Sequence, residues 1–185
     1  MTTLTAQPQT TTTTWTLDPA HSLVEFGAKH MMFTTVKGRF TGVSGTIIDV
    51  ADDPTQSSVE VEIDAASITT GDPQRDGHLK SADFLDVGNF PKLTFRSRRI
   101  EGTRERFQVI GDLTIRGTTR KVSLDAQFQG SGTNPWGKTV AGFTAQTEIN
   151  RKDFGLTWNV ALETGGVLVS DRIKITLEVQ AVKQD

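Results

Sequence analysis

The 185-residue sequence contains no cysteine, no tyrosine and three histidines. The lack of cysteine excludes disulfides, thiolate metal sites and cysteine nucleophiles. With three histidines, any transition-metal site would depend on carboxylates, and we expect neither a metal nor a cofactor. No stretch approaches the roughly 18–20 apolar residues of a membrane span, so no transmembrane segment is expected. A net charge of −2 argues against electrostatic binding of nucleic acid.

The residues that are abundant favour β-structure. The sequence has 28 threonines, 15 valines and 10 isoleucines against 12 leucines and 12 alanines. Side chains branched at Cβ pack well on a pleated sheet, whereas leucine and alanine are the stronger helix formers. This balance predicts an all-β protein.

Apolar and polar residues alternate through much of the chain after Trp15, as in segment 171–180. Such alternation gives a strand one buried face and one solvated face, which is typical of antiparallel sheets. Short connections, such as Arg116-Gly117, have the length of hairpin turns. Strands are expected near 15–28, 38–50, 58–68, 92–100, 106–115, 118–129, 139–150 and 171–182.

Helical segments are scarce. Residues 76–85 are expected to form a short helix with Asp76 as its N-cap, and residues 28–35 another turn or two. Because no helical layer can cover the sheet, the sheet must close on itself or face a second sheet. Long strands and short connections favour a single antiparallel up-and-down barrel of about eight strands over a sandwich. A barrel of this size is either filled by side chains or holds one small ligand.

The chain is expected to form one domain, residues 15–185, after a Thr-rich tail, residues 1–14. The tail's low hydrophobicity predicts disorder. It has neither the basic nor the apolar region of a secretory signal, which predicts a cytoplasmic protein.

Two segments match nucleotide-binding motifs by their letters alone. Residues 132–139 (GTNPWGKT) fit the P-loop pattern, but the residues that follow alternate as a strand, whereas a P-loop leads into a helix. Residues 153–155 (DFG) fit the Mg²⁺-binding tripeptide of kinases, but no H-R-D motif accompanies them. Neither match therefore predicts nucleotide binding, and a wide hairpin loop is expected at 132–139.

The possible sites of chemistry are few. Asp18, His21 and Ser22 have the composition of a hydrolytic triad, but adjacent strand residues point to opposite faces and no G-x-S-x-G elbow is present. Asp18-Pro19 is expected to be a turn that opens the first long strand. The ten phenylalanines fit either a filled core or an apolar cavity, and periodicity does not separate the two.

Several segments together resemble the YceI-like family of bacterial polyisoprenoid-binding, lipocalin-like proteins. The most specific are residues 75–85 (RDGHLKSADFL) followed by 90–95 (FPKLTF). The resemblance runs in order from Trp15 to about Val182, and its other parts are residues 15–26 (WTLDPAHSLVEF), 36–40 (VKGRF), 111–119 (GDLTIRGTT), 134–137 (NPWG) and 152–155 (KDFG).

The resemblance implies a lipocalin-like barrel with a tunnel that binds a long-chain isoprenoid or related lipid for sequestration, transport or storage, without catalysis. It is also compatible with a homodimer. Many relatives begin with a secretory signal, which this sequence lacks. The tunnel residues implied by matching positions are Phe26, Phe33, Val36, Phe40, Leu79, Phe84, Phe95, Ile115 and Phe143. The candidates for binding a lipid headgroup are Arg39, Arg75, His78 and Lys80.

Two alternatives stay open on the sequence alone. The first is an enzyme that acts on an apolar substrate with His21 or His78 as its acid or base. The second is a filled barrel with a stabilising or partner-binding role.

Overall fold

The computed structural model describes residues 10–185, and within them the chain folds into strands, one α-helix and four short 3₁₀ segments. The helix is α1 (Pro73–Lys80). The strands are β1 (Thr12–Leu17), β2 (Leu23–His30), β3 (Thr34–Phe40), β4 (Val43–Val50), β5 (Ser58–Asp64), β6 (Ile68–Thr69), β7 (Lys92–Gly102), β8 (Arg106–Ile115), β9 (Thr118–Thr133), β10 (Thr139–Asn150) and β11 (Val169–Lys183).

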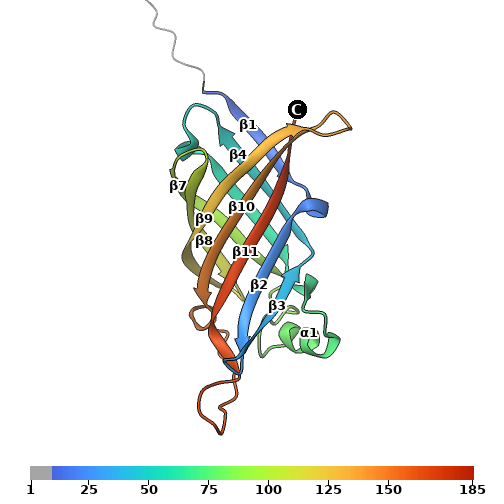
Figure 1. The fold of residues 1–185 in the computed structure, drawn as a ribbon, viewed down its shortest axis with the longest axis vertical. Helices are drawn as coiled ribbons and strands as arrows, with labels where there is room; N and C mark the ends of the chain where they lie inside the picture. The colour runs from blue at the N-terminus through green and yellow to red at the C-terminus, as the bar shows by residue number, and fades with distance from the viewer. Residues whose placement is uncertain (1–9) are drawn as a thin grey trace, which may run out of the picture.

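The sheet closes into an antiparallel barrel (Figure 1). Each strand from β7 to β11 pairs with the next one along the chain, and the first and last strands of the barrel meet where Leu17 of β1 lies opposite Ala181 of β11. The long β11 pairs with β10 along one edge; along its other edge, its N-terminal part pairs with β2 and its C-terminal part with β1. The expected all-β, up-and-down barrel of about eight strands is confirmed.

Three of the eight barrel strands are interrupted, which the alternation did not predict. The breaks separate β1 from β2, β3 from β4, and β5 from β6. In the first, the Asp18 side chain accepts a hydrogen bond from the backbone N–H of Ala20 and caps a 3₁₀ turn, Pro19–His21. The expected turn at Asp18-Pro19 therefore lies inside the first barrel strand and does not open it. The strand begins at Thr12, so residues 12–14 of the predicted tail belong to the barrel; residues 1–9 lie outside the described part.

The helix lies slightly earlier than expected. Asp72, and not Asp76, is its N-cap, with its carboxylate accepting from the backbone N–H groups of Gln74 and Arg75. Asp76 in the first turn instead accepts from the hydroxyl of Thr70 at 2.6 Å. Residues 28–35, expected to be helical, form the β2–β3 hairpin.

The hairpin connections agree with the expectations from turn residues. Arg116 and Gly117 both have positive φ between β8 and β9, as a two-residue primed turn requires. The P-loop-like segment is the β9–β10 loop, where the Asn134 side chain accepts from the backbone N–H groups of Trp136 and Lys138. The chain then continues as β10, so the wide hairpin loop is confirmed.

Close strand packing at Gly111 of β8 leads to a prediction. A Cβ there would lie 2.4 Å from the carbonyl oxygen of Arg96 and 2.7 Å from the Phe95 ring. The backbone carbonyl has little room to move, so we expect Gly111→Ala to lower the free energy of unfolding by about 1–3 kcal/mol. Gly142→Ala in β10 is the matched control, because the nearest atom to its Cβ would be 3.6 Å away. Urea unfolding of both variants measures the difference; equal effects would contradict this packing.

Candidate ligand-binding cavity

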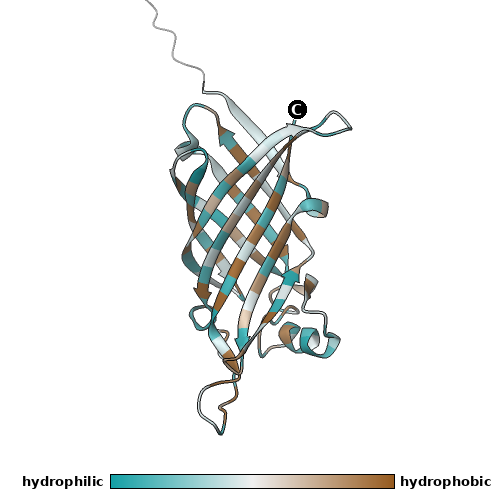
Figure 2. Cartoon of the chain, in the orientation of Figure 1, coloured by the Kyte–Doolittle hydropathy of each residue, from teal (hydrophilic) through white to brown (hydrophobic). Residues whose placement is uncertain are grey.

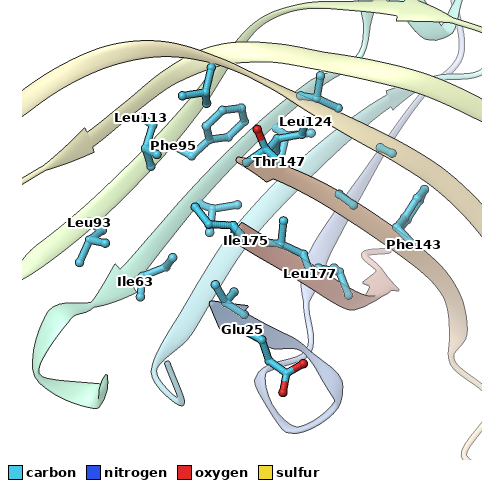
Figure 3. A pocket seen from close by; sticks show the side chains of 18 of the residues that line it. Glu25, Ile63, Leu93, Phe95, Leu113, Leu124, Phe143, Thr147, Ile175 and Leu177 are labelled. Carbon is cyan, nitrogen blue, oxygen red and sulfur yellow. The ribbon is translucent and has the colours of Figure 1, made fainter. Parts of the chain in front are cut away.

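The barrel encloses a cavity of about 420 Å³. Figure 3 shows side chains from opposite walls pointing into the same space, including Phe95, Leu113, Leu124, Ile175 and Leu177. Its lining runs from Arg104, in the β7–β8 hairpin, to Leu85, just after α1. The volume falls within the roughly 300–1,000 Å³ of small-molecule pockets. The interior is therefore large enough to hold a ligand along the barrel.

The same alternation that closes the barrel leaves it hollow. Ile173, Ile175, Leu177 and Val179 of β11 line the cavity, and the residues between them are exposed on the outer face. Figure 2 shows the corresponding alternation of hydrophobic and hydrophilic residues along the barrel strands. These four inward side chains are only half-buried, because the cavity leaves part of their surface uncovered. In a filled barrel they would be packed against the opposite wall. The alternative of a filled barrel is therefore wrong.

The end of the barrel beside α1 is closed by tightly packed side chains. Phe84 and Leu85 are buried there with Phe154, which is 2 % exposed. The His78 ring packs edge-on against Phe84 and Trp158, with ring centroids 5.0 and 4.6 Å apart. The segment after α1 thus forms the floor of the cavity.

Arg151 is the one buried charged residue of the described chain, at 3 % exposure. Its Nε donates to the carbonyl of Ser170 at 2.9 Å, and its Nη1 donates to the carbonyls of Leu156 at 2.8 Å and Trp158 at 2.9 Å. Burial lowers the pKa of its guanidinium, and Asp171, 3.7 Å away, partly opposes this shift. Arg151 borders the cavity, but these donors already bind backbone carbonyls, so its role is structural.

Polar residues gather at the opposite end of the cavity. Asp49, Ser57, Arg104 and Ser131 belong to its lining there. One guanidinium nitrogen of Arg104 donates to the carbonyl of Ala51 at 2.8 Å, and another lies 3.6 Å from the Asp49 carboxylate. The Arg104 side chain is half exposed, so this end of the cavity reaches solvent.

Most of the predicted tunnel residues do line the cavity, although two do not. Those in the lining are Phe26, Phe40, Leu79, Phe84, Phe95, Ile115 and Phe143. Phe33 is 82 % exposed in the β2–β3 turn, and the half-buried Val36 pairs with Ala28 near the same turn. Residues 34–38 of β3, before Arg39, have β2 as their sole partner strand, so this part of the hairpin projects past the barrel wall. Phe33 and Val36 are therefore not among the residues that line this cavity.

None of the predicted headgroup residues lies in the cavity wall. Arg39 is exposed on the outer face, between Glu25 and Thr69 in register. Arg75 donates to the Thr70 hydroxyl and carbonyl, which fastens it to the start of the helix. Lys80 ends α1 outside the lining.

His78 and Asp83 form a pair on the side of the floor away from the cavity, with Nε2 2.8 Å from the carboxylate. At its solvent end the cavity instead presents the guanidinium of Arg104 beside the carboxylate of Asp49, and no motif of the sequence points to either residue.

The other histidine of the enzymatic alternative also lies outside the cavity. His21 Nδ1 is 2.7 Å from the Asp18 carboxylate in the exposed 3₁₀ turn between β1 and β2. This hydrogen bond is the main cause of the lowered pKa of Asp18. Ser22 donates instead to the carbonyl of Gln180 at 3.3 Å. Asp18, which also accepts from the Gln180 amide, and Ser22 therefore fasten the break in the first strand to β11, and His21 is held by Asp18.

A closed, hollow antiparallel barrel with an apolar interior defines the lipocalin-like class of ligand-binding proteins. The sequence profile described as "YceI-like domain" matches residues 15–181. The UPF0312 protein SA2479 of Staphylococcus aureus is 37 % identical over 163 residues, which cover 88 % of this chain and 93 % of the relative. Protein YceI of Salmonella newport is 33 % identical over 164 residues, or 89 % and 83 % of the two chains. The chain belongs to the YceI-like family.

Solved structures show the same fold. The YCEI protein of Campylobacter jejuni has a TM-score of 0.73 at 30 % identity, covering 85 % of this chain and 90 % of that one. A polyisoprenoid binding domain from Saccharophagus degradans has a TM-score of 0.66 at 13 % identity, covering 92 % and 98 %. In residues 10–185, no helix has the length and apolar character needed to cross a membrane, and no group of three or more histidine, aspartate or glutamate side chains is placed to hold a metal ion.

Proposed function

We propose that this protein binds one long-chain isoprenoid or related lipid in its cavity and sequesters, transports or stores it without catalysing a reaction. The ligand would be a polyprenyl phosphate, an isoprenoid quinone or a fatty-acid derivative. The observation that carries the proposal is the continuous apolar cavity along the barrel. The polyisoprenoid binding domain of Saccharophagus degradans, which shares the fold, agrees with this class of ligand.

The energetics favour an apolar chain over a polar ligand. Each Å² of apolar surface that leaves water contributes about 25 cal/mol, so a chain in contact with the wall binds without hydrogen bonds. One methylene changes the binding free energy by about 0.8 kcal/mol, so discrimination by chain length is expected to be weak. Thr147 provides a hydroxyl in the middle of the wall, among Phe95 and Leu124 (Figure 3).

The solvent end of the cavity is the proposed position of the ligand's polar head. Arg104 there offers a guanidinium to an acidic head, and Ser57 and Ser131 line the same end. The Asp49 carboxylate lies 3.6 Å from the Arg104 guanidinium, and its negative charge lowers the net positive charge of this end. A phosphate is therefore expected to depend on Arg104 more strongly than an uncharged quinone does.

Extraction of the purified protein with organic solvent, followed by mass spectrometry, tests the proposal. We expect a long-chain apolar molecule to be released, and the emptied protein to bind polyprenyl phosphate or isoprenoid quinone again. An empty barrel that takes up neither ligand would contradict the proposal. Arg104→Gln is expected to weaken binding of the phosphate while leaving the quinone unchanged.

The same preparation separates binding from catalysis. His21→Ala and His78→Ala are expected to retain the lipid, because neither side chain lines the cavity. Turnover of a lipid ester or phosphate by the wild type that disappears in either variant would support the enzymatic alternative instead.

A further inference from the structure

Apolar side chains are exposed together at the α1 end of the barrel. Met31, Met32 and Phe33 form the β2–β3 turn. Val160 lies in the loop that leads into β11, residues 157–168, and all four side chains are exposed. The backbone N–H of Met31 donates to the carbonyl of Leu168 at 2.8 Å, which joins the turn to the loop. Figure 1 shows the turn and the loop projecting from the same end. We call these four residues the apolar tip.

The β2–β3 turn places methionines at two positions whose backbone conformation favours asparagine and glycine. Met31 and Met32 have φ of 49° and 65°, and the N–H of Phe33 donates to the carbonyl of His30 at 3.1 Å. Positive φ at both central positions is the geometry of a type I′ turn, which favours Asn-Gly. Methionine rarely adopts this backbone region. Two exposed apolar side chains are thus kept at a backbone cost, and such outliers are typical of functional positions.

Lysines stand directly behind the tip on the outer face. Lys29 of β2 is two residues from Met31, and Lys37 of β3 and Lys174 of β11 both lie opposite Gly27 in register. All three are exposed. Among residues 10–185, the lysines found in ion pairs are Lys92, Lys138 and Lys152. Lys29, Lys37 and Lys174 are therefore free of ion pairs within this range. Carboxylates at the same end are Glu163 in the loop, Asp153 in the 3₁₀ turn Arg151–Phe154, Asp171, which pairs with Lys152, and Glu148, which lies opposite Lys174 in register and pairs with Arg172; Glu25 lies farther along β2.

We propose that the apolar tip inserts into the surface of an anionic lipid bilayer while Lys29, Lys37 and Lys174 contact the lipid phosphates. Apolar side chains backed by basic residues are the pattern of proteins that lie in a membrane interface. A stable protein partner needs about 800 Å² on each side, far more than one turn and one loop offer. The projecting shape and the positive charge therefore fit a bilayer better than a second protein.

The tip lies beside the closed end of the cavity. Ala28 and Val169, which line the cavity, lie next to the tip: Ala28 is three residues before Met31, and Val169 pairs with His30. Insertion of the tip would therefore place the closed end of the barrel on the bilayer and leave the Arg104 end facing the solvent. Docking itself does not depend on which lipid the cavity holds.

Sedimentation with vesicles tests the proposal. Wild-type protein is mixed with vesicles of phosphatidylcholine alone or with added phosphatidylglycerol, and the bound fraction is measured. The variant Met31→Asn/Met32→Gly/Phe33→Ser is expected to lose on the order of tenfold or more in partitioning, since three apolar side chains no longer leave water. Its melting temperature is expected to rise, because Asn-Gly suits the turn, so weaker binding would not reflect unfolding.

Two further variants make the result specific. Trp136→Ser changes a side chain that is 81 % exposed at the tip of the β9–β10 loop, at the other end of the barrel, and is expected to bind as the wild type does. Lys29→Gln, Lys37→Gln and Lys174→Gln are each expected to weaken binding about fivefold on anionic vesicles alone.

Several results would overturn the proposal. These are no binding of the wild type to either vesicle, equal losses in Trp136→Ser and the tip variant, and no preference for anionic lipid. A wild-type oligomer that becomes a monomer in the tip variant would also overturn it, by assigning the tip to protein contact. Lipid extraction from the cavity is measured separately, so failure of docking and failure of the proposed function are distinguishable.

Discussion

Replacing Arg151 with methionine is expected to lower the free energy of unfolding by about 3–5 kcal/mol. The guanidinium donates to the carbonyls of Leu156 and Trp158, in the loop before β11, and of Ser170 in β11, so it joins two segments at the closed end of the barrel. Methionine has a similar length but no donor, so these buried carbonyls would lose their partner. Asp171, whose Oδ1 is buried without a hydrogen bond, would lose one of its two nearby positive charges and keep that of Lys152.

Two other variants test this explanation. Arg151→Lys keeps the charge but offers donors from one nitrogen, so it is expected to recover only part of the loss. Arg172→Met removes an arginine at the same end that is 79 % exposed and paired with Glu148, and it is expected to change stability by about 1 kcal/mol or less. Chemical denaturation of the three variants measures these differences. If Arg151→Met matched Arg172→Met, the buried network would not stabilise the closed end.

The barrel was predictable because alternation is a local property. Segments such as 171–180 carry the pattern in full, and β11 follows it. The breaks inside the barrel strands were not predictable from alternation, because they are fixed by hydrogen bonds to partners distant in the chain. Thr41, after β3, donates to the carbonyl of Ser67 near β6, and Gln180 donates to Asp18 across 162 residues. No short window of sequence contains such a pairing.

The candidate site was predictable in its apolar part and not in its polar part. Inward positions such as Phe95 and Phe143 follow from alternation and the resemblance, and both line the cavity. Phe33 was predicted from the resemblance alone, and the sequence does not reveal that the β2–β3 hairpin extends past the wall. The polar end needs residues from three distant segments, Asp49, Arg104 and Ser131, so only the closed barrel brings them together.

The hollow interior itself leads to the prediction with the largest effect on function. Ala145 of β10 lines the cavity and lies opposite Leu177 of β11 and Ala126 of β9. Ala145→Trp would place an indole across the path of a bound chain. Each methylene displaced from the wall costs about 0.8 kcal/mol, so loss of even two lowers affinity about tenfold. We expect the variant to purify without lipid and to bind added quinone at least about tenfold more weakly.

Gln146→Trp is the matched control, because the neighbouring strand residue is exposed on the outer face. It adds the same side chain to the same strand and is expected to retain the wild-type lipid. Mass spectrometry of extracts and fluorescence titration with quinone compare the two, and circular dichroism melting checks that both are folded. Folded Ala145→Trp protein that keeps its lipid would mean that the chain does not run along this wall. Equal loss in both variants would mean that the ligand lies outside the barrel.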